Sequence, residues 1–256
     1  MITFFFIVLV LIFGSIYFYI DGVPAISNFV VNRLPNSIDN EVGEEARKEI
    51  LKEAAIDNDK TQLLNEFYKE LHFDNETKVY VVKANEFNAF ALPDNSIFVF
   101  DKVLYDVTSY EELAALLAHE YSHIKYRHGI KGIAQSLSWE LLGKVISGDD
   151  NSNDFVRNSN LLLTLENSRV FETQADIGGL ELLRQQHIDQ KGMTDLFQVM
   201  LKLPQQDKKQ IPAYLSTHPD TEERLVKVQK VIKEKTSDSK ANIKLELIFN
   251  KLTFKE

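Results

Sequence analysis

The most regular hydrophobic pattern in this chain runs from residue 110 to residue 127. Five apolar side chains recur there at spacings of three and four: Leu113, Leu116, Leu117, Tyr121 and Ile124. That spacing has the period of an α-helix. Ser109 followed by Glu112 fits a capping box at the start of such a helix, and Gly129 fits a stop signal at its end. We therefore predict one helix over residues 110–127.

Two segments upstream have the period of β-strands. Residues 78–83 form a short run rich in strand-forming side chains. Within residues 87–100, apolar side chains alternate on both sides of the turn cluster Pro93-Asp94-Asn95-Ser96. Alternation interrupted by such a cluster is typical of a β-hairpin. We predict a hairpin directly before the helix over residues 110–127.

The rest of the chain favours helices. Residues from about 25 to 72 are amphipathic with a break at Pro35, and helical patterns recur at 137–146, 155–186, 194–203 and 221–235. Residues 147–153 form a polar loop, and residues 243–254 fit a strand or a helix equally well. We therefore expect an α+β fold that is mainly α-helical, with a small β-hairpin or sheet beside the helix over residues 110–127.

The N-terminal segment differs from all of this. Residues 2–20 contain no charged side chain, and a helix of that length spans the hydrocarbon layer of a membrane. A cleaved signal peptide is the competing interpretation, since Val23-Pro24-Ala25 resembles a cleavage site, but the apolar run is long and no positive charge precedes it. We expect a retained single-pass transmembrane anchor and linker over residues 1–24, and one folded domain over residues 25–256.

Composition narrows the possible functions. The formal net charge of −9 makes nucleic acid an unfavourable partner. The chain has no cysteine, which excludes thiol catalysis, disulfides and cysteine metal sites together. Any metal ion must therefore be held by carboxylates and by members of a set of six histidines.

The predicted helix carries the sequence His119-Glu120-Tyr121-Ser122-His123, which has the pattern H-E-x-x-H. Two imidazoles four residues apart lie on one helix face, where both can bind one ion, and Glu120 points into the same space as a candidate base. The pattern is that of a zinc hydrolase with one Zn²⁺ per chain. The alternative is that the two histidines are simply solvated on a helix surface.

A catalytic zinc ion commonly has three protein ligands, so one ligand is missing. His128 is one candidate, although it lies about a turn and a half beyond His123 and is rotated away from the pair. Glu172 on a second helix is the other candidate. Asp176, one turn further, could accept a hydrogen bond from a ligand histidine. Acidic residues on a helix face are usually solvated, so the residues alone leave this choice open.

Four ordered motifs now resemble a known family. They are His119-Glu120-x-x-His123 with His128, Glu172-x-x-x-Asp176, Ser216-Thr217-His218-Pro219 with Arg224, and Asn88-Ala89-Phe90-Ala91-Leu92-Pro93 with Ile97-Phe98-Val99. Together these motifs resemble the membrane-associated zinc metallopeptidases of the HtpX and CAAX prenyl protease type, which belong to the gluzincin group. The resemblance extends from about residue 79 to residue 226, and it implies a zincin-like metalloprotease domain.

The resemblance also implies a role for each matching residue. The metal ligands would be His119, His123 and Glu172, the catalytic residues Glu120 and His218, the supporting residues Asp176 and Arg224, and the substrate-binding strand Asn88, Ala89, Phe90 and Ala91. His128 matches a family histidine that is not a ligand. Two positions depart from the pattern, because the family often has glutamate at the position of Gln174 and glycine at that of Asp94. We expect these two departures to affect the shape of the cleft.

The sequence and the resemblance together predict a membrane-anchored zinc metalloendopeptidase that hydrolyses unfolded or misfolded proteins in quality control, with its catalytic domain in a periplasm-like space. One alternative is a non-catalytic zinc-binding membrane adaptor, although such a protein needs no base at Glu120. A structural zinc site is another, with His128 or His218 as fourth ligand. The enzyme could also be latent, with residues 147–153 or the C-terminal tail covering the cleft.

Overall fold

The computed structural model describes residues 14, 28–29, 31–136, 168–203, 213–235 and 238–254. Apart from residue 14, the segment predicted as a transmembrane anchor lies outside the described residues. The helix predicted over 137–146 and the polar loop over 147–153 lie outside them too. Within the part of the chain that is described, no helix is both long enough and apolar enough to cross a membrane. The anchor therefore stays a prediction.

Three strands form one small sheet in the order β1-β3-β2. These are β1 (Lys78–Val82), β2 (Ala89–Leu92) and β3 (Ser96–Phe100). The predicted hairpin is confirmed, since β2 pairs with β3 antiparallel, with Phe90 opposite Phe98. Strand β1 pairs with β3 in parallel, so β3 is the buried central strand and β2 lies at an edge among the described strands.

Two long helices precede the sheet within the described residues, in the region 25–72 that was predicted to be helical. They are α3 (Asn36–Glu53), which begins directly after Pro35, and α4 (Asn58–Leu71). The side chain of Asp57 accepts a hydrogen bond from the backbone N–H of Lys60 and so caps α4. Helix α3 is tied to the hairpin turn by an ion pair between Arg47 Nε and Asp94 Oδ2 at 2.6 Å. Asp94, where the family often has glycine, therefore holds the turn against α3.

The motif-bearing helix is α6 (Tyr110–Lys125), and it begins where predicted. Ser109 Oγ accepts from the backbone N–H of Glu112, but the carboxylate of Glu112 bonds to Thr108 instead of returning to Ser109. The predicted C-terminus is wrong. Arg127 adopts a left-handed φ of 58°, which ends α6, and Gly129 lies inside the next helix, α7 (His128–Ser136).

The remaining helices are α5 (Asp101–Asp106), α11 (Arg169–Gln185), α12 (Lys191–Lys202), α13 (Ala213–Thr217), α14 (Thr221–Glu234) and α15 (Ile243–Thr253). Of these, α11, α12 and α14 lie where helices were predicted, whereas α5 and α13 were not predicted, and α5 separates the hairpin from α6. The ambiguous tail forms α15 and is thus helical. Residues 155–167 of the predicted long helical region lie outside the described residues.

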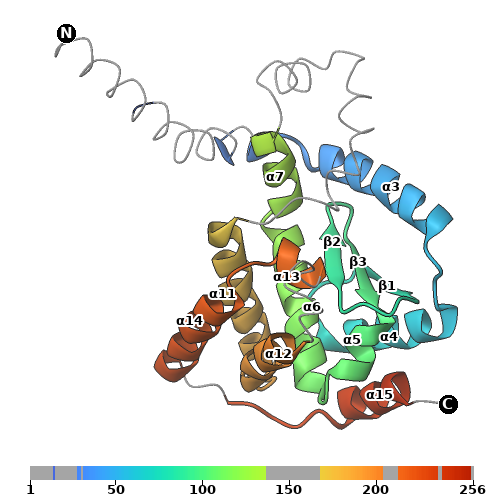
Figure 1. Cartoon of the computed structure of the whole chain (residues 1–256), viewed down its shortest axis with the longest axis vertical. Helices are drawn as coiled ribbons and strands as arrows, with labels where there is room; N and C mark the ends of the chain where they lie inside the picture. The colour runs from blue at the N-terminus through green and yellow to red at the C-terminus, as the bar shows by residue number, and fades with distance from the viewer. Residues whose placement is uncertain are drawn as a thin grey trace.

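Helix α6 is the centre of the fold, with the sheet on one side and α11, α12 and α14 on the other (Figure 1). Most of its side chains are buried, including a continuous apolar run from Leu113 to Ala118. A helix that is buried nearly all round offers its polar groups to other protein groups instead of water. The polar residues His119, Glu120 and His123 therefore need partners from neighbouring elements.

Two glycines allow α11 to approach α6 closely. A Cβ atom added at Gly178 would lie 2.8 Å from Ser122 Oγ, and one added at Gly179 would lie 3.3 Å from the backbone nitrogen of His119. Side chains at these positions would push the two helices apart. The glycine pair therefore sets the spacing at which residues of α11 reach the motif on α6.

Candidate metal centre

Four elements bring the predicted site residues together. Helix α6 carries His119, Glu120 and His123, α11 carries Glu172 and Asp176, His218 follows α13, and α14 carries Arg224. None of these seven residues is more than 7% exposed. His119 and His218, which lie 99 residues apart in the sequence, thus share one buried site.

Two imidazole nitrogens and the two carboxylate oxygens of Glu172 lie close enough together to share one metal ion. His119 Nε2 lies 3.0 Å from His123 Nε2 and 3.6 Å from Glu172 Oε2, and His123 Nε2 lies 3.4 Å from Glu172 Oε1. Ligands held about 2.0–2.2 Å from a tetrahedral zinc ion lie about 3.3–3.6 Å from one another. The side chains therefore fit a zinc ion without rearrangement of the helices.

The charges of the site also fit a divalent cation. Glu120, Glu172 and Asp176 are buried carboxylates, and Arg224 is the buried cation beside them. With neutral histidines, the formal charge of this group of residues is −2. Buried charge needs compensation, and one divalent ion supplies it. Imidazole and carboxylate donors without thiolates are a donor set that zinc accepts.

Arg224 joins the two carboxylates of α11. Its Nη1 lies 2.5 Å from Glu172 Oε2, while Nη2 and Nε contact the two oxygens of Asp176 at 2.7 and 2.9 Å. Burial by itself would raise the pKa of Glu172, but His218 and Arg224 outweigh it and hold that pKa well below its usual value. Burial is outweighed at Asp176 also, mainly by Arg224, so its pKa is lowered. Both carboxylates are thus ready to act as anions.

Asp176 lies behind the first histidine of the motif. Its Oδ1 is 3.0 Å from His119 Nδ1, although the two atoms are not aligned for a hydrogen bond. The contact is on the side of the ring opposite the donor nitrogen Nε2. A carboxylate there orients the imidazole and favours a proton on Nδ1. The supporting role of Asp176 stays a prediction.

His218 contacts the candidate metal ligands directly. Its Nδ1 is 3.0 Å from Glu172 Oε1 and 3.4 Å from His119 Nε2, and its Nε2 is 3.7 Å from Glu120 Oε1. All four candidate donors, from His119, His123, Glu172 and His218, lie within 4.8 Å of one another. Burial opposes protonation of His218, but Glu172 and Glu120 outweigh it and raise the pKa of the imidazole.

The sequence reasoning missed one residue of this site, Tyr214. Its hydroxyl donates a hydrogen bond of 3.3 Å to Glu120 Oε1, and its ring stacks on His218 with centroids 4.3 Å apart. Burial raises the pKa of Tyr214 well above its usual value, so the hydroxyl keeps its proton. Tyr214 precedes His218 by one helical turn, and that spacing was the available signal.

His128 is not among the clustered donors. Its Nδ1 lies 3.0 Å from Nδ1 of His123, on the side of that ring away from Glu172, and its Nε2 lies 3.0 Å from Gln174 Oε1. Burial lowers the pKa of His128 to about 4, so the ring is neutral at physiological pH. His128 therefore contacts the candidate ligand His123 from behind.

Strand β2, which carries most of the predicted substrate-binding residues, contacts α6, the helix that bears the motif. Ala89 is buried, whereas Asn88, Phe90 and Ala91 are partly exposed. Phe90 stacks on Phe98 of β3 with ring centroids 5.2 Å apart, so its ring lies against the sheet.

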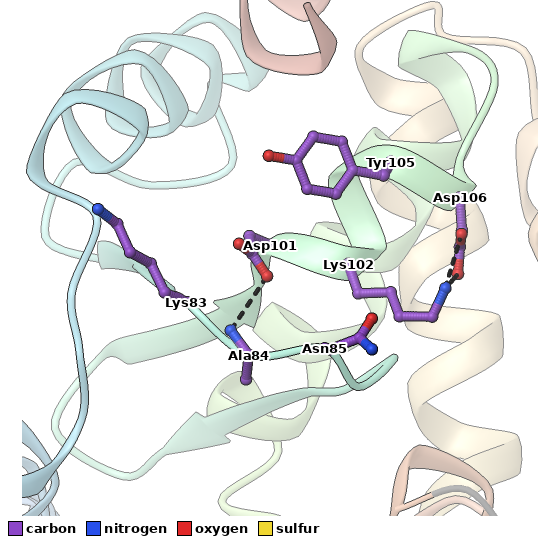
Figure 2. A pocket seen from close by; sticks show the side chains of 7 residues that line it. All are labelled: Lys83, Ala84, Asn85, Asp101, Lys102, Tyr105 and Asp106. Carbon is purple, nitrogen blue, oxygen red and sulfur yellow. Dashed lines mark hydrogen bonds and ion pairs between the residues drawn. The ribbon is translucent and has the colours of Figure 1, made fainter. Parts of the chain in front are cut away.

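A separate pocket of about 410 Å³ opens beside α5, and none of its lining residues belongs to the metal centre (Figure 2). Its charged groups already have partners. Lys102 donates to both oxygens of Asp106, and Asp101 accepts from the backbone N–H of Ala84. We assign this pocket no role.

A buried H-E-x-x-H helix that meets a glutamate from a second helix, with an arginine and an aspartate behind them, defines a zinc metallopeptidase. The sequence pattern of Peptidase family M48 matches residues 55–232. The chain belongs to that family. This confirms the resemblance at the level of the family and the expectation of a hydrolase with zinc as cofactor, while the narrower HtpX and CAAX prenyl protease type stays a prediction.

Similar proteins include three metalloendopeptidases. The chain is 32% identical over 181 residues to Mitochondrial metalloendopeptidase OMA1 of Schizosaccharomyces pombe, which covers 64% of this chain and 51% of that protein. It is 33% identical over 148 residues to the Arabidopsis thaliana protein of the same name, covering 57% of this chain and 30% of the relative. The Saccharomyces cerevisiae protein is 27% identical over 149 residues, covering 56% and 43%. The chain thus spans about half or less of the length of these relatives.

The lowered pKa values of Glu172 and Asp176 predict acid sensitivity of the metal-free protein. Both carboxylates bind fewer protons in the folded state than in the unfolded state, so their stabilising effect is present above the unfolded pKa values of 4.5 and 3.8 and is lost as the pH falls. Each group contributes a slope of up to about 1.4 kcal/mol per pH unit. Urea unfolding of the chelated protein between pH 7 and pH 3 measures the slope. Glu172→Gln is the control and should give a shallower slope; equal slopes would contradict the prediction.

Proposed function

We propose that this protein is a zinc-dependent metalloendopeptidase in which His119, His123 and Glu172 bind one zinc ion and Glu120 is the general base. One observation carries the proposal. The Nε2 atoms of His119 and His123 lie 3.0 Å apart, each lies 3.4–3.6 Å from an oxygen of Glu172, and the buried carboxylate of Glu120 follows His119 on the same helix. A closed structural site has no need of such a carboxylate, whereas peptide hydrolysis requires a base.

The residues divide the chemistry between them. A bound zinc ion supplies a Lewis acid that lowers the pKa of water and polarises a carbonyl group. Glu120 takes the proton of the attacking water and returns it to the leaving amine. His218 donates a hydrogen bond to the developing oxyanion, a contact worth about 3 kcal/mol in comparable sites. Tyr214, whose hydroxyl bonds to Glu120, holds the base in place.

Strand β2 is the proposed contact for the substrate backbone. It lies at an edge of the sheet among the described strands, and an edge strand offers unpaired backbone groups to an extended peptide. The side-chain oxygen of Asn88 is buried and has no hydrogen-bond partner within the described residues. Recognition of main chain at Asn88, Ala89, Phe90 and Ala91 favours broad specificity, which a peptide-library cleavage profile tests.

The cellular role that we propose is quality control at a membrane. Residues 2–20 would form a single-pass anchor, residues 25–256 the catalytic domain, and unfolded or misfolded chains the substrates. The similarity to proteins named as mitochondrial metalloendopeptidases supports proteolysis. The matched segments cover 64% and 57% of this chain. The catalytic domain would lie on the extracytoplasmic side of the membrane. Protection of the domain from added protease in sealed vesicles of known orientation tests this placement.

Ligand variants test the assignment of the metal centre. His123→Ala and Glu172→Ala should each lose stoichiometric zinc, because each removes a donor from a three-ligand site. The measurement is zinc content by atomic spectroscopy after gel filtration, together with cleavage of casein with and without chelator. His128→Ala is the comparison: it removes no donor atom and should retain more zinc than either ligand variant. If Glu172→Ala keeps its zinc while His128→Ala loses it, the assignment is wrong.

A latent enzyme is the second candidate, and one observation favours it. Nδ1 of His218 lies 3.4 Å from His119 Nε2 and 3.0 Å from Glu172 Oε1, a position from which it could serve as a fourth ligand and close the site. His218→Ala separates the two functions. Activity should fall if His218 donates to the oxyanion, whereas activity should rise if His218 occupies the position that a substrate needs.

A further inference from the structure

A hydrogen-bonded series of side chains runs outward from the metal centre behind His123, through the buried ring of His128 to the exposed side chain of Gln174. His128 Nδ1 lies 3.0 Å from His123 Nδ1, and His128 Nε2 lies 3.0 Å from Gln174 Oε1. The ring of His128 is 1% exposed and stacks on Phe171 with centroids 4.4 Å apart and planes 10° apart. Both ring nitrogens of His128 are therefore occupied by protein groups, and stacking fixes the plane of the ring.

If His123 binds a metal ion through Nε2, the ring protons of His123 and His128 can be placed in only one way. A ligand nitrogen must carry a lone pair, so the single ring proton of His123 must be on Nδ1, with Nε2 free. That N–H then donates to Nδ1 of His128. His128 must in turn carry its own proton on Nε2, which donates to the side-chain oxygen of Gln174.

The opposite orientation of the Gln174 amide would disable the ligand. If the amide nitrogen faced His128, it would donate to Nε2 and move the proton of His128 to Nδ1. That proton would point at His123 Nδ1, which would have to accept it. The proton of His123 would then be on Nε2, where the metal ion binds. The orientation of the Gln174 amide thus selects the tautomer of His123, although the two side chains are connected only through His128.

The two histidines of the motif have different partners behind them. His119 has the anionic Asp176 at 3.0 Å, whereas His123 has a neutral pair, His128 and Gln174. A carboxylate can only accept, so it sets the tautomer of its histidine directly. His128 and Gln174 can fix the tautomer of His123 only because the Gln174 side-chain oxygen accepts the proton of His128 Nε2.

We propose that Gln174 is a positioning residue that acts through His128 to hold His123 in the tautomer and orientation that bind the metal ion. The inference rests on the proposed function in that it takes His123 as a zinc ligand. It predicts that the hydrogen-bond acceptor at position 174, and not the volume of the side chain, controls zinc affinity.

Three variants of the full chain in detergent test this inference by zinc affinity, measured through competition with a chromogenic chelator. Gln174→Leu removes the acceptor and should weaken zinc binding by about 10–100-fold, the usual effect of losing an outer partner of a ligand. Gln174→Glu keeps an acceptor and should bind zinc within about threefold of wild type or more tightly. Gln185→Leu, at an exposed position of the same helix, is the control and should change nothing.

Two results would overturn the inference. Gln174→Leu could bind zinc as tightly as wild type, or Gln174→Glu could lose as much affinity as Gln174→Leu, which would indicate a role in packing alone. The tautomers provide a second measurement that needs no variant. In ¹⁵N-histidine NMR spectra of the zinc-loaded wild type, the protons should be on Nδ1 of His123 and Nε2 of His128, and the opposite assignment would contradict the inference.

The same measurements keep this inference separate from the proposed function. A chain that binds zinc with the expected ranking of variants but cleaves no peptide would overturn the proposed protease activity and leave the role of Gln174 standing. A wild-type chain that binds no zinc would overturn both. A chain that cleaves peptides while Gln174→Leu keeps full zinc affinity would overturn the inference alone.

Discussion

Replacing Glu120 with glutamine will remove proteolytic activity and leave zinc bound. The side chain is 1% exposed, and its carboxylate contacts Tyr214 and His218 at the edge of the donor cluster. Glutamine has nearly the same shape, so packing is preserved, but an amide cannot take the proton of water. Loss of a general base lowers the rate by about 10²–10⁴-fold.

The experiment pairs casein cleavage with zinc content for wild type and Glu120→Gln. Glu111→Gln is a matched control on the same helix, because it makes the same chemical change more than two turns away from Glu120 and should cleave at the wild-type rate. Zinc stoichiometry near one in all three proteins would show that the metal site is intact. Activity above about a tenth of the wild-type rate in Glu120→Gln would contradict the role of Glu120 as base.

Replacing Arg224 with methionine should cause the largest loss of stability. Arg224 is 3% exposed and makes charged contacts with both Glu172 and Asp176. Removing one partner of a buried ion pair leaves uncompensated charge and costs about 3–5 kcal/mol. Here two carboxylates would lose their cation, so we expect the metal-free protein to be at the upper end of that range. A bound zinc ion should restore part of the loss.

Urea unfolding with and without zinc measures both effects. Arg169→Met is the control, since Arg169 pairs with Asp220 at an exposed position, with 73% of its side chain accessible. Exposed ion pairs contribute about 0–1 kcal/mol, so this variant should unfold close to wild type. A loss below about 1 kcal/mol in Arg224→Met, or an equal loss with and without zinc, would indicate that Arg224 does not compensate the metal centre.

The local patterns of the sequence predicted most of the elements, and the reason is visible in α6 and the hairpin. Leu113, Leu116 and Leu117 face the core with the period of a helix, and the alternation in β2 and β3 is equally local. The predicted end of α6 was wrong because a single residue, Arg127, adopts a left-handed backbone conformation. The hydrophobic period of a sequence does not reveal a single left-handed residue. Gly129, which was interpreted as the stop signal, lies within α7.

The site could be predicted only where motifs cover it. The spacing of His119 and His123 indicates a shared ion, but the choice between Glu172 and His128 depends on how α11 crosses α6. That crossing is set by the close contact of Gly178 and Gly179 with α6, which no periodicity in the sequence expresses. Tyr214 was missed for a similar reason, since its role depends on the stacking of its ring on His218.

The distribution of the site over the chain has a consequence during synthesis. His119 and His123 leave the ribosome early, but Glu172 follows about fifty residues later, and His218 and Arg224 later still. A nascent chain that ends before α11 has the two histidines without Glu172, and one that ends before α14 has both carboxylates without Arg224. Because closing such long loops is entropically costly, these contacts should also form late in folding. The contacts that complete the metal centre of the peptidase therefore depend on segments that are synthesised after the motif-bearing helix.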